Sequence, residues 1–86
     1  MNISRGSVVD TEALCDALER GVITGAALDV YENEPHVPER LRAIGTAVLT
    51  PHMAAYAESA QVGQRAMVLE NLEAFFAGRP LVSQVA

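Results

Sequence analysis

Polar and charged side chains follow three predicted strands, each just after the point where the strand ends. Ser4 and Arg5 follow the first strand, Asp29 follows the second, and Thr50 and His52 follow the third. In an open parallel sheet, ligands bind beyond the carboxyl ends of the strands, so these side chains are expected to share one edge. An arginine, a carboxylate and a histidine that converge there can bind an anionic substrate and transfer a proton.

The carboxylate of this group has two further candidates in the loop behind the second strand, Glu32 and Glu34. Composition alone does not choose between them. Arg5 and His52 also have simpler interpretations. Arg5 would be an ordinary surface or helix-capping residue, and His52 would only form a hydrogen bond with a loop. Cys15 reads as an inert packed thiol, because nothing near it in sequence would depress its pKa. The hypothesis of a site therefore depends on the convergence of the three strand ends.

The elements that would position these side chains alternate between strands and helices. Asp10 precedes a stretch with apolar residues at helical spacing and Gly21 follows it, which predicts a short helix over residues 11–20. The stretch VITGAALDVY lacks alternation and is rich in small and β-branched residues, as in a strand covered by helices on both faces. A proline-containing loop, ENEPHVPER, then leads to a helical turn at LRAI and a short buried strand at TAVLT.

The longest predicted element is a helix over residues 58–77, which Gly78 and Pro80 close. Apolar residues line one of its faces: Val68, Leu69, Leu72, Phe75 and Phe76. The order strand, helix, strand, loop, strand, long helix is typical of an α/β protein with a parallel sheet and right-handed crossovers. Three strands do not complete such a sheet, so we expect only part of one.

Composition excludes several classes of function. The chain has 86 residues, half of them hydrophobic, and a net charge of −5 with scattered arginines and no lysine. It therefore forms one domain at most and has no basic stripe that would bind nucleic acid. No apolar stretch approaches the roughly 20 residues of a membrane span. A single cysteine and the absence of zinc-ligand spacing argue against a metal site and favour the cytoplasm.

Three motifs occur in a fixed order: N-x-x-R-G-x-x-V-D from Asn2, G-A-x-x-D-V-x-x-x-E-P from Gly25, and T-P-H at residues 50–52. With these motifs, residues 2–80 resemble the C-terminal part of the D-isomer-specific 2-hydroxyacid dehydrogenases. That family includes phosphoglycerate dehydrogenases, glyoxylate/hydroxypyruvate reductases and D-lactate dehydrogenases. The resemblance implies the C-terminal portion of a Rossmann-type α/β fold, with a catalytic trio of Arg5, Glu34 and His52. It thus favours Glu34 over Glu32.

The resemblance implies a role for each member of the trio. The guanidinium fork of Arg5 would bind the carboxylate of a 2-keto acid and polarise the carbonyl that receives hydride. His52, as imidazolium, would donate the proton and act as general base in the reverse direction. Glu34 would hydrogen-bond the other ring nitrogen and fix its tautomer. A glutamate here argues against the formate dehydrogenase branch, which has a glutamine in that role.

The resemblance also implies contacts with the nicotinamide end of NAD or NADP, made by Ile3, Ser4, Arg5, Asp29, His52, Ala54 and Ala55. Asp29 would contact the carboxamide. The chain has no G-x-G-x-x-G loop and no acidic residue on a ribose strand, which precede this region in full-length members. We expect residues 1–55 to be the C-terminal part of the NAD(P)-binding Rossmann domain, and residues 56–86 the crossover helix and tail that pack on the substrate domain.

Together these features predict an NAD(P)-dependent reductase of small 2-keto acids, of the glyoxylate or hydroxypyruvate class, present as a C-terminal fragment. The 86 residues alone are expected to be inactive, since the phosphate-binding loop is missing. The apolar face of the last helix favours a homo-oligomer or association with the missing N-terminal portion. Two alternatives stay open: an inactive fragment that serves as an assembly or binding module, and a nucleotide-sensing regulator.

Overall fold

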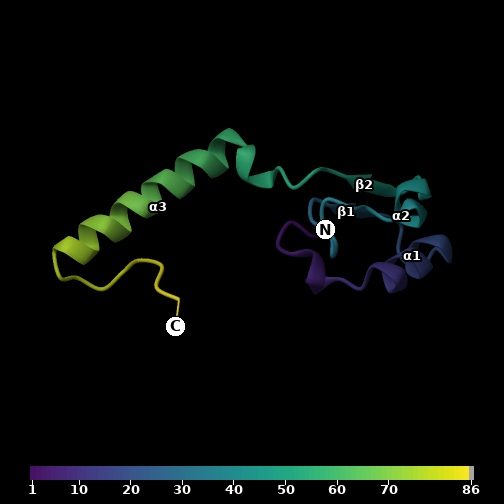
Figure 1. The fold of residues 1–86 in the computed structure, drawn as a ribbon, viewed down its shortest axis with the longest axis horizontal. Helices are drawn as coiled ribbons and strands as arrows, with labels where there is room; N and C mark the ends of the chain where they lie inside the picture. The colour runs from purple at the N-terminus through teal and green to yellow at the C-terminus, as the bar shows by residue number, and fades with distance from the viewer. Residues whose placement is uncertain (86) are drawn as a thin grey trace. The chain divides into compact units, whose positions relative to one another are not determined.

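A computed structural model describes residues 1–85, which divide into a compact unit of Met1–Ala54 and a second unit from Ala55 onward. The first unit contains a 3₁₀ turn η1 (Gly6–Val8), helix α1 (Thr11–Glu19), strand β1 (Ala26–Leu28), helix α2 (Glu39–Ala43) and strand β2 (Ala47–Leu49). A second 3₁₀ turn, η2 (Ala54–Tyr56), spans the boundary, and helix α3 (Glu58–Phe76) dominates the second unit. Figure 1 shows these elements in order along the chain.

The sheet is parallel, as predicted. β1 and β2 pair in the register Ala26 with Ala47 and Leu28 with Leu49. On the other side of β1, Asn2 forms a parallel bridge to Leu28, with its N–H donating to Ala27 O at 2.9 Å. β1 therefore lies between the opening segment and β2, which confirms the α/β fold with parallel pairing.

The strands are shorter than the sequence pattern indicates. The opening segment contributes only the bridge at Asn2, because the chain turns into η1 at Gly6. β1 covers three residues of the predicted stretch VITGAALDVY, and its partner β2 is equally short. A strand extends only where a neighbour pairs with it, so the hydrophobic pattern overestimates its length.

α1 begins and ends where its sequence signals predict. The Asp10 side chain accepts a hydrogen bond from Ala13 N at 2.9 Å, which satisfies one of the unpaired N–H groups of the first turn. Gly21 follows the helix at φ +66°, in the left-handed region where glycine carries no steric cost. Local residue chemistry therefore determines both ends of this helix.

The core of the first unit lies between the sheet and its two helices. Cys15 of α1, Leu28 of β1 and Leu41 of α2 form the buried cluster, and α1 and α2 lie together beside the strands in Figure 1. The opposite face of the sheet, which includes Ile3 and Val48, is exposed. The expectation of a sheet covered on both faces is therefore wrong for the described residues, where helices cover one face.

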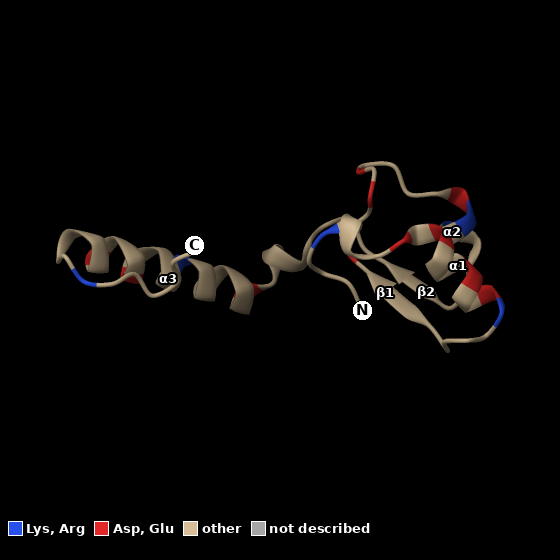
Figure 2. Cartoon of the chain, turned by 90° about the horizontal axis from the view of Figure 1, so that it is seen from below, with Lys and Arg blue, Asp and Glu red and all other residues tan. Residues whose placement is uncertain are grey.

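An ion-pair network joins α1 to α2. Arg40 of α2 contacts three carboxylates of α1: Glu12 at 2.7 Å, Asp16 at 2.5 Å and Glu19 at 2.7 Å. The bond with Glu19 is the largest cause of the raised pKa of Arg40, and the bonds with Asp16 and Glu12 add to it. The same bond with Arg40 is the main reason that the pKa of Glu19 is lowered. Figure 2 shows acidic and basic residues gathered over these two helices. The network links two helices that pack on the same core.

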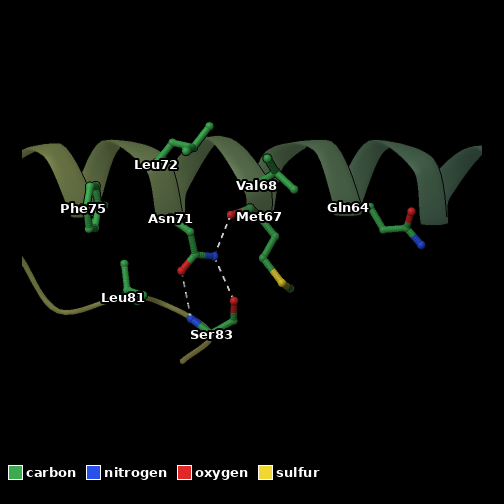
Figure 3. Close-up of a pocket in the computed structure, with 8 residues that line it drawn as sticks. All are labelled: Gln64, Met67, Val68, Asn71, Leu72, Phe75, Leu81 and Ser83. Carbon is green, nitrogen blue, oxygen red and sulfur yellow. Dashed lines mark hydrogen bonds between the residues drawn. The ribbon is translucent and has the colours of Figure 1, made fainter. Parts of the chain in front are cut away.

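The second unit consists of α3 and a tail that returns along it. Gly78, at φ +66°, ends the helix near the predicted position. The Asn71 amide oxygen then accepts from the N–H groups of Val82 and Ser83, and its nitrogen donates to Ser83 Oγ. Figure 3 shows the two contacts between Asn71 and Ser83. Most large apolar side chains of α3 are exposed. Within residues 1–85, no helix is long and apolar enough to span a membrane.

Candidate active site

The structure brings the three predicted functional side chains together. Arg5, Glu34 and His52 line one open cleft of about 480 Å³, at the carboxyl ends of the three parallel segments. The cleft is also lined by Gly6, Ser7, Tyr31 and Glu32. Its walls come from three chain segments that are far apart in sequence, as expected for ligand binding at the end of a parallel sheet.

Glu34 and His52 form a direct pair. Glu34 Oε2 lies 2.7 Å from His52 Nδ1, while Glu34 Oε1 accepts a hydrogen bond from Tyr31 N at 2.9 Å. The bond with His52 is the main reason that the pKa of Glu34 lies below its ordinary value, and the Tyr31 N–H adds to the effect. Glu32 instead lies 3.4 Å from Thr11 N, so the geometry pairs His52 with Glu34.

The His52 backbone has an uncommon conformation. Its φ of +53° lies in the left-handed region, which costs a non-glycine residue roughly 1–2 kcal/mol. Neighbouring hydrogen bonds stabilise this turn, because the buried Asp29 carboxylate accepts from Thr50 Oγ1 at 2.5 Å and from Met53 N at 2.9 Å. Its other oxygen accepts from Ala54 N at 2.8 Å. Asp29 therefore bonds the Thr50 hydroxyl before His52 and two backbone N–H groups after it.

The hydrogen bonds to Asp29 also favour its ionised form. The side chain is buried, with 4% of its surface exposed. The Thr50 hydroxyl is the main cause of its lowered pKa, and the N–H groups of Met53 and Ala54 lower it further against the opposing effect of burial. Three of about four acceptor positions on the carboxylate are filled by the protein itself. One position is left for a further donor.

The Arg5 side chain is exposed in the cleft, but its backbone carbonyl is hydrogen-bonded by Asn2. The Asn2 amide oxygen accepts from Ser4 N and Ser4 Oγ, each at 3.1 Å, and the Asn2 amide nitrogen donates to Arg5 O at 2.8 Å. One guanidinium nitrogen of Arg5 donates to Ser4 O at 2.6 Å. The guanidinium has five N–H donors, so several can still bind an anion.

The other predicted cofactor residues are distributed around the sheet. Ile3 and Asp29 line a small cavity of about 130 Å³ on the exposed face, next to Ala27 and Thr50. The Ser4 hydroxyl is bonded to Asn2, and the Ala54 N–H to Asp29. Ala55 begins the second unit. Among residues 1–85, no cluster of three or more histidine, cysteine, aspartate or glutamate side chains could hold a metal ion.

Two residues that shape the site were not predicted from the sequence. The Tyr31 hydroxyl shares its single proton between Thr50 O at 2.8 Å and Leu28 O at 3.2 Å, so it joins the carboxyl ends of β1 and β2. The Asn2 amide organises the segment that carries Arg5. An asparagine two residues before a serine is a sequence signal for such a turn, whereas nothing in the sequence indicates the hydroxyl contacts of Tyr31.

A guanidinium beside a histidine–carboxylate pair suits a defined kind of chemistry. The guanidinium binds a carboxylate through parallel N–H···O bonds. The histidine can exchange a proton through Nε2 while Glu34 fixes Nδ1. The arrangement therefore fits an enzyme that binds a small carboxylic acid and transfers a proton next to the bound carboxylate.

Comparison with known proteins identifies the family of this chain. Residues 1–54 match the family described as "D-isomer specific 2-hydroxyacid dehydrogenase, NAD binding domain". The chain is 42% identical over 85 residues to glyoxylate/hydroxypyruvate reductase HPR3 of Arabidopsis thaliana, covering 99% of this chain and 26% of the relative. It is 47% identical over 78 residues to a glyoxylate reductase of Pyrococcus horikoshii, covering 91% of this chain and 23% of the relative.

Solved structures give the same result. The NADPH-dependent glyoxylate/hydroxypyruvate reductase of Sinorhizobium meliloti, in complex with NADP and malonate, superposes with a TM-score of 0.74 at 42% identity, over 99% of this chain and 27% of that one. The apo D-mandelate dehydrogenase of Rhodotorula graminis gives a TM-score of 0.78 at 31% identity, over 99% and 25%. The chain thus spans about a quarter of the length of its relatives. It belongs to the D-isomer-specific 2-hydroxyacid dehydrogenases, and its first 54 residues match their NAD-binding domain.

Proposed function

We propose that the protein carrying this chain is an NAD(P)-dependent reductase of small 2-keto acids, of the glyoxylate or hydroxypyruvate class. The observation that carries the proposal is the cleft in which Arg5 lies beside the bonded pair of Glu34 and His52. The names of the relatives from Arabidopsis thaliana and Pyrococcus horikoshii support the substrate class. Since the chain spans about a quarter of those relatives, the activity is proposed for the whole protein.

Arg5 binds the substrate in this proposal. A 2-keto acid carries its carboxylate next to the carbonyl, so a guanidinium can contact both groups at once. Arg5 uses one N–H donor on Ser4 O and keeps the others for the substrate. A lysine would present a single ammonium in place of this fork, so it would orient the carbonyl less well.

His52 transfers the proton. Because Nδ1 is bonded to Glu34 at 2.7 Å, Nε2 is the nitrogen that donates a proton to the carbonyl oxygen during reduction and removes it during oxidation. Glu34 stabilises the charged ring and is itself oriented by the Tyr31 N–H. When bound, a reduced nicotinamide supplies the hydride to the carbonyl carbon, which together with this proton gives the 2-hydroxy acid.

The residues around Asp29 fit the nicotinamide end of such a cofactor. The remaining acceptor position on Asp29 can take an N–H of the carboxamide, since three positions are filled by Thr50, Met53 and Ala54. The small cavity that Asp29 helps to line is otherwise mainly apolar, with Ile3 among its walls, which suits a planar ring. Its volume of about 130 Å³ suits one ring rather than a whole dinucleotide.

A hybrid enzyme tests the proposal. Residues 1–86 replace the aligned segment of the Sinorhizobium meliloti reductase, which is 42% identical. We expect the hybrid to oxidise NADPH when glyoxylate or hydroxypyruvate is added. His52→Asn should lower kcat by about 10²- to 10⁴-fold, which is the usual contribution of a general acid. Arg5→Lys should mainly raise KM, because it weakens carboxylate binding.

Two control variants make the result specific. His36→Asn changes the other histidine, which is exposed in the loop, and Glu32→Gln changes the carboxylate that is not paired with His52. Both should keep activity close to that of the parent hybrid, whereas Glu34→Gln should lower kcat. A hybrid that binds NADPH, measured by fluorescence, yet reduces no 2-keto acid would contradict the proposal. Full activity of His52→Asn would contradict the role of the histidine.

We further propose that the apolar side chains of α3 pack on parts of the whole protein that lie outside this chain. The support is that Leu72, Phe75 and Phe76 are exposed, Phe76 to 82%, while the relatives are about four times as long as the chain. In the hybrid, Phe76→Gln should lower the melting temperature and Glu70→Gln should not. An unchanged melting temperature for Phe76→Gln would contradict this packing.

A further inference from the structure

Asn2 is a buried polar residue whose side-chain amide makes three hydrogen bonds. It exposes 6% of its surface, and only Asp29 is a comparably buried polar residue within residues 1–85. Its amide oxygen accepts from Ser4 N and Ser4 Oγ, and its amide nitrogen donates to Arg5 O at 2.8 Å. A buried amide that lost these partners would be costly, so the turn and the side chain stabilise each other.

The two backbone contacts of Asn2 flank the peptide group between Ser4 and Arg5. One holds the N–H of Ser4, just before that group, and the other holds the carbonyl of Arg5, just after it. The carbonyl of the flanked peptide group, Ser4 O, accepts the Arg5 guanidinium at 2.6 Å. The Asn2 amide therefore fixes the orientation of the carbonyl that holds the guanidinium.

The backbone of Asn2 connects this turn to the sheet. Asn2 N donates to Ala27 O at 2.9 Å, and Asn2 O accepts from Asp29 N at 3.0 Å. β1 leads directly into the segment that carries Tyr31 and Glu34, which line the same cleft as Arg5. A single residue thus links the position of Arg5 to the strand that leads to the other half of the cleft.

We infer that Asn2 is a positioning residue for Arg5, and that its side-chain amide determines how tightly the cleft binds a carboxylate. The inference rests on the proposed role of Arg5 as the carboxylate-binding group. Asn2 makes no hydrogen bond to Glu34 or His52 among those of the described residues. Its effect therefore falls on substrate binding and not on proton transfer.

The test uses the hybrid enzyme and the isosteric variant Asn2→Asp. An aspartate keeps an oxygen for Ser4 N but places a second oxygen against Arg5 O, where the amide nitrogen donated. We expect Asn2→Asp to raise the KM for glyoxylate about tenfold, in line with loss of one buried hydrogen bond. kcat should change by less than about twofold, because the variant leaves the proton donor in place.

A binding measurement separates this inference from the proposed function. Oxalate is an unreactive dicarboxylate. Its dissociation constant in the presence of NADP therefore measures how strongly Arg5 binds a carboxylate, without turnover. We expect Asn2→Asp to weaken oxalate binding about as much as it raises KM. Asn33→Ala, at an exposed asparagine of the loop, is the matched control and should leave both unchanged. If the parent hybrid binds oxalate but reduces no 2-keto acid, the proposed function fails, while weaker oxalate binding by Asn2→Asp still supports the inference.

Several results would overturn the inference. Unchanged KM and oxalate affinity in Asn2→Asp would do so, and so would a fall in kcat or melting temperature without any change in binding, which would show a merely structural role. Oxalate binding that is insensitive to Arg5→Lys would remove its premise. If Asn2→Asp does not fold, Ser4→Ala removes only the 3.1 Å contact between Ser4 Oγ and the amide oxygen. That milder variant should raise KM about twofold, and an unchanged KM would count against the inference.

Discussion

The backbone of Gly6 lies directly against the carbonyl group of Tyr31, with no space for a side chain between them. This close approach places the segment that follows Arg5 beside the segment that leads to Glu34. Both segments line the cleft. The glycine is therefore required by packing between two parts of the site, and its φ is not in the left-handed region.

Replacing Gly6 with alanine should separate these two segments. The new Cβ would overlap the Tyr31 carbonyl, and overpacking of this kind costs about 1–3 kcal/mol. We expect Gly6→Ala to lower the free energy of unfolding by that amount in urea denaturation. Gly45→Ala is the control, since a Cβ at Gly45 meets nothing within 4 Å. Equal stability of the two variants would show that the Tyr31 contact is not tight.

The Glu34–His52 pair predicts a dependence of stability on pH. The pKa of Glu34 is lowered from its ordinary 4.5, first by the hydrogen bond with His52 and then by the Tyr31 N–H. A lowered pKa means that the carboxylate stabilises the fold above about pH 4.5, and that this contribution is lost as the pH falls through the lowered value. The wild-type chain should therefore exceed Glu34→Gln in stability at pH 6, and the two should converge as the pH falls from 4.5 through the lowered pKa of Glu34.

The measurement is urea denaturation of both chains between pH 7 and pH 3. Glu32→Gln serves as the control, because that carboxylate makes only a 3.4 Å contact with Thr11 N. A stability difference between wild type and Glu34→Gln that stays constant over the whole range would argue against an ionised, hydrogen-bonded Glu34.

Leu41 should carry much of the stability of the first unit. Its side chain is completely buried, between Cys15 of α1 and Leu28 of β1. Leu41→Ala removes buried methyl groups and leaves a cavity, which typically costs about 2–5 kcal/mol. Val48→Ala, at a side chain that is 64% exposed, should cost much less. Chemical denaturation followed by circular dichroism compares the two, and similar losses would place the core elsewhere.

The Arg40 network predicts a salt-dependent contribution to stability. Arg40 contacts Glu12, Asp16 and Glu19, all of which are partly exposed, so salt should screen these contacts. Arg40→Gln also leaves three acidic side chains on α1 without their common partner. We expect it to lower the melting temperature by a few degrees in low salt, and by less in about 1 M NaCl.

Arg42→Gln, on the same helix α2, is the matched control and should show little salt dependence. Melting curves recorded over a series of NaCl concentrations give the comparison. If Arg40→Gln and Arg42→Gln lower the melting temperature equally at every salt concentration, the effect of Arg40→Gln comes from the loss of a positive charge in general, and the ion-pair network adds no stability of its own.

Some elements of this protein could be predicted because their causes are local. Asp10 and Gly21 delimit α1, and Gly78 ends α3, through hydrogen bonds and backbone angles that involve only neighbouring residues. The parallel sheet could be predicted from the alternation of strands and helices. That alternation also placed Arg5 and His52 at one edge, because parallel strands present their carboxyl ends on the same side.

Other features depend on contacts between distant residues. The residues alone left Glu32 and Glu34 equal, and the path of the loop decided that Glu34 reaches His52 at 2.7 Å. The strand lengths depend on where a neighbour pairs, and the Tyr31 hydroxyl finds its acceptors on Leu28 and Thr50 only after β1 and β2 align. Sequence thus determined which chemical groups are present and which edge they share, because residue type and strand direction are local properties. Tertiary structure decided which groups touch, because hydrogen-bond distances depend on packing between segments far apart in the chain.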